Sequence, residues 1–179
     1  MCCKTMEVYE LKKPPGVWCS HCTIGKGCKI YGEHPPTCQG FRCQWLLNPA
    51  IADGLRPDRS KVVLTSDDGG TRLIAHCDPA TPIVWKKEPM YSCLKAEARH
   101  TWGSNLTVVA RAGRRIWVIA PTEDLDLGEI DPRSPYVIDQ RADGRAEVRV
   151  LPPIAEDQNP DEVMSRMRKG LRRHGGRPE

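Results

Sequence analysis

Cysteine is concentrated near the start of this chain, at spacings that suit metal ligands. Seven of the nine cysteines fall within the first 43 residues: Cys2, Cys3, Cys19, Cys22, Cys28, Cys38 and Cys43. A C-x2-C pair such as Cys19 and Cys22 lets two sulfurs reach one ion from a single turn, and a tetrahedral site takes four thiolates or three with a histidine. Thiolates are soft ligands that suit Zn²⁺ and iron–sulfur clusters. The pattern therefore predicts metal-bound cysteines, with zinc favoured as the cofactor and iron or an iron–sulfur cluster as alternatives.

Residues 1–47 need a cross-link, because they hold too few apolar side chains for a core of their own. Metal, disulfides and unligated thiols are the three interpretations. The N-terminal run MCCKTMEVYELKK has no apolar stretch after positive charge, so we expect no secretory signal and a cytoplasmic location, where disulfides are rare. An odd total of cysteines also fits full disulfide pairing poorly. Metal is favoured, since one structural zinc supplies roughly 10–16 kcal/mol of apparent binding energy.

The segment from Cys28 to Cys43 follows the pattern C-x-I-Y-x-x-x-P-x-x-C-x-x-F-x-C. Together with the upstream runs CCK and WCSHC, it resembles the YkgJ-type cysteine-cluster proteins of bacteria, which are described as zinc- or iron-chelating. The similarity covers about residues 2–60. It implies that all seven of these cysteines are metal ligands, and it implies no settled reaction.

Two departures from the family pattern leave one ligand position to be filled. The family carries a further cysteine three residues before the Cys–Cys pair, a position that would precede Met1 here. It also carries an arginine where this chain has His34. We expect either a chain start upstream of Met1, or a site one ligand short, or completion by His21 or His34. The alternative role of each histidine is that of a solvated loop imidazole.

The residues after the cluster predict an α+β domain at 61–151, behind a polar linker at 48–60. Three pairs of β-rich runs indicate hairpins: 62–66 with 71–77, 105–112 with 115–122, and 136–141 with 146–151. Between Glu88 and Trp102, apolar residues recur at helical spacing. Six strands and one helix in this order predict a mostly antiparallel sheet with one packed helix, preceded by a loop-rich cysteine knuckle at 1–47. No apolar run approaches the roughly 20 residues of a membrane span, so no membrane partner is expected.

A basic helix is predicted at 159–175, beginning with an Asn-Pro pair that suits a helix start. Four of its cations would be available to nucleic acid or to an acidic protein partner: Arg166, Lys169, Arg172 and Arg173. The alternative is a solvated helix whose cations lie at the favourable C-terminal end of the helix dipole.

The other polar residues favour structural roles. Cys77, Cys93, His76 and His100 are expected as buried or solvated side chains, and Asp67–Asp68 followed by two glycines as a turn. The leading hypothesis is a metal-binding protein that acts as a binding or accessory module rather than as an enzyme. The alternatives are an iron–sulfur redox or sensor protein, and a nucleic-acid-associated module that uses the basic helix.

Overall fold

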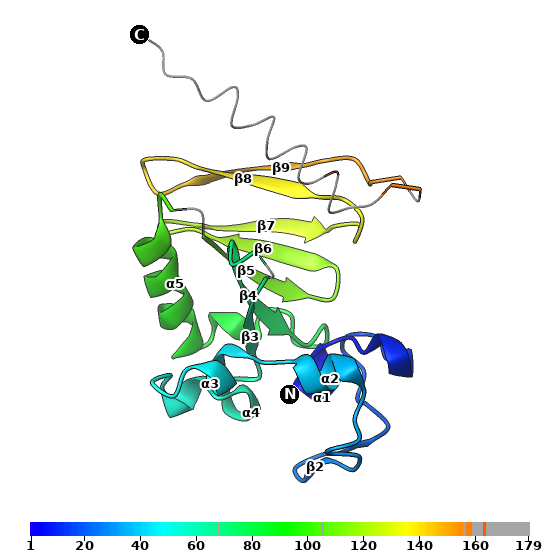
Figure 1. Cartoon of the computed structure of the whole chain (residues 1–179). Helices are drawn as coiled ribbons and strands as arrows, with labels where there is room; N and C mark the ends of the chain where they lie inside the picture. The colour runs from blue at the N-terminus through cyan, green and yellow to red at the C-terminus, as the bar shows by residue number, and fades with distance from the viewer. Residues whose placement is uncertain (68, 105, 156, 159–162, 164–179) are drawn as a thin grey trace.

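A mixed five-stranded sheet and one long helix form the centre of an α+β fold (Figure 1). The computed structural model describes residues 1–67, 69–104, 106–155, 157–158 and 163. The sheet has the order β3-β4-β5-β6-β7, with the bounds β3 Val63–Ser66, β4 Arg72–Cys77, β5 Thr107–Ala112, β6 Arg115–Ile119 and β7 Asp124–Glu129. As predicted, most of its strand pairs are antiparallel, whereas β4 runs parallel to β5.

Helix α5 (Met90–Thr101) is the crossover that allows the parallel pair. Parallel neighbours cannot be joined by a tight turn and need a long connection, commonly a helix. The chain leaves β4, passes through the 3-10 helix η3 (Val84–Lys86) and then α5, and enters β5. The helix predicted between Glu88 and Trp102 is therefore confirmed.

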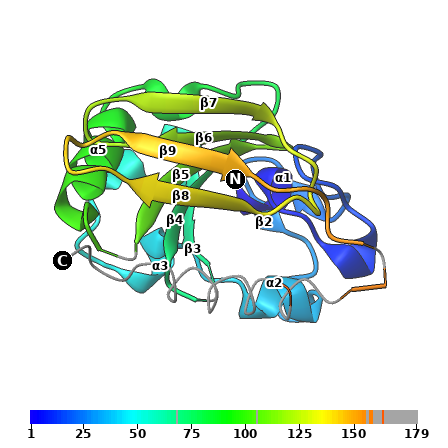
Figure 2. The same ribbon diagram turned by 90° about the horizontal axis from the view of Figure 1, so that it is seen from above.

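The two faces of the sheet are covered by different elements, because successive side chains of a strand point to opposite faces. On one face, Leu94 of α5 packs with Val108 of β5 in the larger hydrophobic core. On the other face, a hairpin of β8 (Tyr136–Gln140) and β9 (Ala146–Val150) packs against a smaller core that includes Val109. Figure 2 shows this hairpin lying over the strands of the sheet. The centre of the protein thus has three layers.

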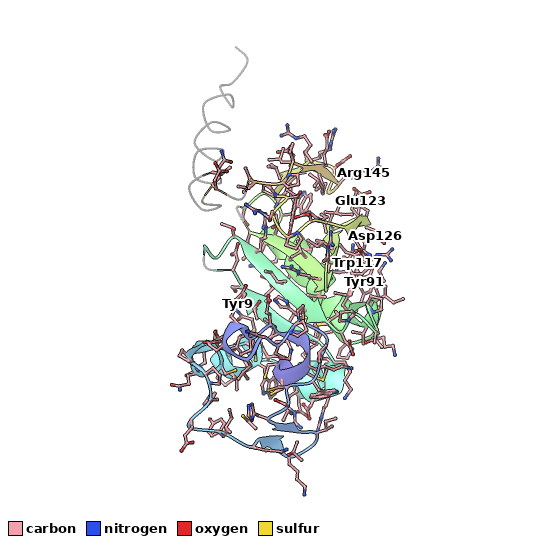
Figure 3. The ribbon with its side chains drawn as sticks, turned by 90° about the vertical axis from the view of Figure 1, so that its right-hand side faces the viewer. Tyr9, Tyr91, Trp117, Glu123, Asp126 and Arg145 are labelled. Carbon is pink, nitrogen blue, oxygen red and sulfur yellow. The ribbon has the colours of Figure 1, made fainter. Side chains whose placement is uncertain are left out.

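A buried carboxylate ties the edge strand β7 to α5. The side chain of Asp124 is 9% exposed. It accepts a hydrogen bond from the Tyr91 hydroxyl at 3.0 Å and another from the Lys95 ammonium at 3.2 Å. The ring of Trp85, which is fully buried, lies 6.0 Å from the rings of both Tyr91 and Trp117. Figure 3 labels the last two residues, on the same side of the molecule. These contacts fix the helix and the sheet edge as one unit.

The residues before the sheet form short elements beside its β3 edge (Figure 1). They are α1 (Cys2–Thr5), η1 (Tyr9–Leu11), β1 (Cys22–Thr23), β2 (Gly27–Cys28), α2 (Pro36–Gly40), α3 (Gln44–Leu47), η2 (Asp53–Leu55) and α4 (Pro57–Ser60). Strands β1 and β2 form a separate antiparallel pair.

The three predicted hairpins are confirmed as β3–β4, β5–β6 and β8–β9. The segment 48–60, predicted as a linker, contains η2 and α4, and its Leu55 belongs to the larger core. Strand β7 was not predicted from the sequence. The predicted basic helix at 159–175, including Arg166, Lys169, Arg172 and Arg173, lies outside the described residues except for Val163. Within the described part of the chain, no helix has the length and apolar character needed to cross a membrane.

Candidate metal centre

The adjacent cysteines of α1 lie beside the C-x2-C pair. The amide N–H of Cys19 donates to the carbonyl oxygen of Cys3 at 2.9 Å, and the amide of Cys22 donates to the carbonyl of Cys19 at 2.9 Å, which closes a turn. The thiols of Cys2 and Cys22 both act on the pKa of the Cys3 thiol, and so lie near it. Four of the seven predicted ligands, from two separate segments, are thereby brought together.

The contact between Cys2 and Cys3 drives their pKa values apart. The hydrogen bond that the Cys2 thiol donates to the Cys3 sulfur raises the pKa of Cys2 and lowers the pKa of Cys3. Burial of Cys3 and its contact with Cys22 oppose this effect without reversing it. Of these two thiols, that of Cys3 therefore loses its proton first as the pH rises, and the thiolate is the form that binds metal.

The β1–β2 hairpin sets Cys28 opposite Cys22. These two residues are direct partners in the antiparallel register, so their side chains lie on the same face with Cα atoms about 4.5–5.5 Å apart. The turn between the two strands contains Gly25 at a φ of 81°, and Gly27 begins β2 at a φ of 117°, values that glycine adopts without steric cost. A tight glycine turn therefore brings a fifth thiol to the group.

Cys38 reaches the same group from α2. Burial raises the pKa of the Cys38 thiol, and the charges of three other cysteines raise it further: Cys19, Cys2 and Cys28. Helix α2 is held by Glu10, whose carboxylate accepts hydrogen bonds from the amide and the hydroxyl of Thr37 at 3.0 and 2.8 Å. Six of the seven predicted ligands thus lie on segments that come near one another.

The seventh cysteine and the two histidines have different surroundings. Cys43 is 6% exposed and lies at the start of α3, where its carbonyl accepts the amide of Leu46 at 2.9 Å. The Nδ1 atom of His34 accepts the amide of Gly32 at 3.1 Å, and its ring stacks on Tyr31 with 5.1 Å between centroids. His21 is half-buried between two of the clustered cysteines. The contacts of His34 are thus with residues of its own loop, whereas His21 lies between Cys19 and Cys22 in the sequence.

A buried lysine that sequence analysis missed lies among these segments. Lys13 is 6% exposed, and its ammonium donates hydrogen bonds to the carbonyl oxygens of Lys4, Met6 and Pro14. Burial lowers the pKa of Lys13, and four thiols act in the opposite direction: Cys19, Cys3, Cys2 and Cys38. No sequence pattern distinguishes it from its exposed neighbour Lys12, because its partners are backbone atoms.

All nine cysteines lie in the described part of the chain and are free thiols. With the side chains as placed, no group of three His, Cys, Asp or Glu residues among those described is arranged to hold a metal ion. The chemistry of the clustered thiols and the convergence of their segments fit a thiophilic metal, and ligation requires side-chain rotations that bring the sulfurs to about 2.3 Å from one ion.

The cysteine-bearing segments are fastened to the sheet at the end of β4. The Lys4 ammonium forms an ion pair with Asp78, whose side chain is 8% exposed. Gly16, at a φ of 81°, packs so closely on Pro79 that a Cβ atom there would lie 2.8 Å from the proline ring. The Gly16 amide also donates to the carbonyl of Lys4 at 2.8 Å. The position of α1 relative to the sheet is therefore fixed by charge and by close packing.

The remaining polar residues have the surroundings of structural groups. Burial raises the pKa of the Cys77 thiol to about 12 and also raises that of Cys93, so both thiols stay protonated at neutral pH. Burial lowers the pKa of His76 to about 4. The Asp67 carboxylate accepts the amide of Thr71 at 2.7 Å, which confirms its role in the turn between β3 and β4.

The chain matches no protein-family model, and neither a curated protein nor a solved structure matches it. No relative therefore supplies a function or a set of site residues. The functional argument rests on the residues of the cysteine cluster and on the way the fold brings them together.

Proposed function

We propose that this protein is a metal-binding cysteine-cluster protein that acts as a binding or accessory module, with zinc as its metal. The observation that carries the proposal is the convergence of six cysteines from separate segments: Cys2, Cys3, Cys19, Cys22, Cys28 and Cys38. Free thiols of this number suit the reducing cytoplasm, which we propose as the location. The resemblance of the cysteine pattern to the YkgJ-type proteins supports the same proposal.

The metal would supply the cross-link that these segments otherwise lack. Several large apolar side chains of residues 1–47 are exposed rather than buried: Tyr9, Val17, Ile24, Tyr31, Leu46 and Leu47. Tyr9 is labelled in Figure 3. Apolar burial therefore contributes little to the stability of this part of the chain, whereas a thiolate-bound ion contributes binding energy directly to folding. The ion pair between Lys4 and Asp78 would then connect the metal-bound segment to the sheet.

Matched substitutions test the proposal. Cys22→Ser removes a thiol from the centre of the group, and we expect it to release the metal from the anaerobically purified protein. Cys93→Ser removes a half-buried thiol on α5 and is expected to keep the full metal content. Equal metal content in both variants, measured by elemental analysis, would show that Cys22 is not a ligand.

A further inference from the structure

Lys13 occupies a position that is unusual for a lysine. It is almost fully buried, and a short antiparallel bridge to Val8 fixes its backbone, with hydrogen bonds of 3.0 and 3.1 Å. A buried ammonium is costly unless each of its donors has an acceptor. An ammonium has three donors, and here there are three carbonyl acceptors, those of Lys4, Met6 and Pro14. Every N–H donor of the Lys13 ammonium is therefore hydrogen bonded to a backbone carbonyl oxygen.

The three acceptors belong to the two segments that carry the first four thiols. Lys4 lies in α1 directly after Cys2 and Cys3, and Met6 ends that helix. Pro14 lies in the loop that leads to Cys19. The ammonium thus joins the helix that bears the cysteine pair to the loop that bears the C-x2-C pair. The hydrogen bonds from Gly16 to Lys4 and from Cys19 to Cys3 continue the same junction.

The Lys13 ammonium also brings a positive charge close to the cysteine-bearing segments. It lies 3.0 Å from the carbonyl oxygen of Lys4, which follows Cys3 directly, and 3.0 Å from that of Pro14. In keeping with this position, four thiols act to raise the pKa of Lys13: Cys19, Cys3, Cys2 and Cys38. Thiolates around a divalent ion leave net negative charge on the site, and a fixed cation beside them stabilises that charge. Groups of this kind, which orient ligands and tune a site without touching the metal, commonly change metal affinity by 10- to 100-fold.

We infer that Lys13 is a positioning residue of the cysteine cluster, which holds the Cys2–Cys3 and Cys19–Cys22 segments together and places one positive charge beside their sulfurs. This inference rests on the proposed function, since it assigns a role toward the bound metal. It differs from a general role in folding, because the charge acts on the sulfurs themselves as well as on the backbone.

The test compares Lys13→Met, Lys13→Gln and the matched control Lys12→Met in the full-length protein. Zinc affinity is measured by chelator competition, and Co²⁺ serves as the spectroscopic probe. We expect zinc binding to weaken by about 10- to 100-fold in Lys13→Met, by less in Lys13→Gln, and not at all in Lys12→Met. Amide exchange at Gly16 and Cys19 should be roughly tenfold faster in Lys13→Met. If Lys13→Met does not fold, zinc affinity is compared between Lys13→Gln and Lys12→Met.

The cobalt spectrum distinguishes an effect of the lost positive charge from an effect of altered folding. In Lys13→Gln, which keeps N–H donors, we expect tetrahedral d–d bands at the wild-type positions and sulfur-to-cobalt charge-transfer bands moved to lower energy. Wild-type zinc affinity in both Lys13 variants would overturn the inference, as would weaker binding with unmoved charge-transfer bands in Lys13→Gln. A wild-type protein that binds neither zinc nor cobalt would instead refute the proposed function, while the amide-exchange comparison would still decide whether Lys13 holds the two segments together.

Discussion

The ion pair between Lys4 and Asp78 allows the attachment of the cysteine segments to the sheet to be measured. Lys4→Met keeps the length of the side chain and removes its charge. The two side chains are 23% and 8% exposed, so the pair lies between a surface pair, worth about 0–1 kcal/mol, and a fully buried pair, whose disruption costs about 3–5 kcal/mol. We expect a loss of about 2 kcal/mol, which corresponds to a fall in Tm of about 4–8 °C for a chain of this length.

The pH dependence of this loss of stability shows whether the Asp78 carboxylate causes it. Burial raises the pKa of Asp78, but the hydrogen bonds from Lys4 and from the amide of Ala80 outweigh it, and the pKa in the folded protein lies below its ordinary value. A carboxyl with a lowered pKa stabilises the fold above its unfolded pKa of about 3.9, and the stabilisation is lost as the pH falls through the folded pKa. The difference between wild type and Lys4→Met should therefore be full at pH 7 and should shrink below about pH 4.

Thermal unfolding followed by circular dichroism provides the assay. Acid releases bound metal from both proteins, so the difference between them at each pH is the quantity to compare. The control is Arg149→Met, which breaks a pair with Asp139 whose side chains are both more than half exposed, and which should cost less than about 1 kcal/mol. An equal loss of stability for both variants, or a loss for Lys4→Met that persists in acid, would show that the Lys4–Asp78 ion pair does not stabilise the protein as described.

Two further predictions concern the sheet and its helix. Leu94 is fully buried, so Leu94→Ala should lower the free energy of unfolding by about 3 kcal/mol in urea titration; a loss below about 1 kcal/mol would mean that α5 does not pack as described. Burial lowers the pKa of His76 to about 4, so its imidazole resonances should titrate near that pH and the protein should lose stability as the pH falls below about 6.5. An NMR midpoint near 6.5 would place His76 in solvent.

Local patterns predicted the elements of the sheet well, because each depended on neighbouring residues. Leu94 and Ala98 recur at helical spacing and are buried where α5 meets the sheet. The parallel pairing of β4 with β5 depends instead on which distant strands meet, although a helix between two strands is itself the signal of a crossover. Strand β7 was missed because Asp124 and Asp126 are residues that strands disfavour. Their alternation with leucines was the signal that could have found it.

The ligand assignment of the candidate metal centre stays a prediction from sequence, whereas the groups that hold its segments in place were not predicted. Cysteine spacing alone singled out the seven thiols, six of which the fold brings together. Lys13 could not be found in this way, because its partners are backbone carbonyl oxygens that carry no residue signature. The same holds for Asp78, whose partner Lys4 lies far away in the sequence. Residue types and spacing suggest candidate donors for a metal, whereas the groups that hold the donor segments together become visible only in the fold.

The most direct test of the proposed zinc binding is the metal content of the protein purified without oxygen, measured together with its absorption spectrum. We expect a colourless protein that contains zinc in at least equimolar amount and loses it when Cys22 is replaced. A brown protein that contains iron and sulfide would contradict zinc and favour the iron–sulfur alternative. A protein with no metal and nine reactive or buried thiols would contradict the account as a whole.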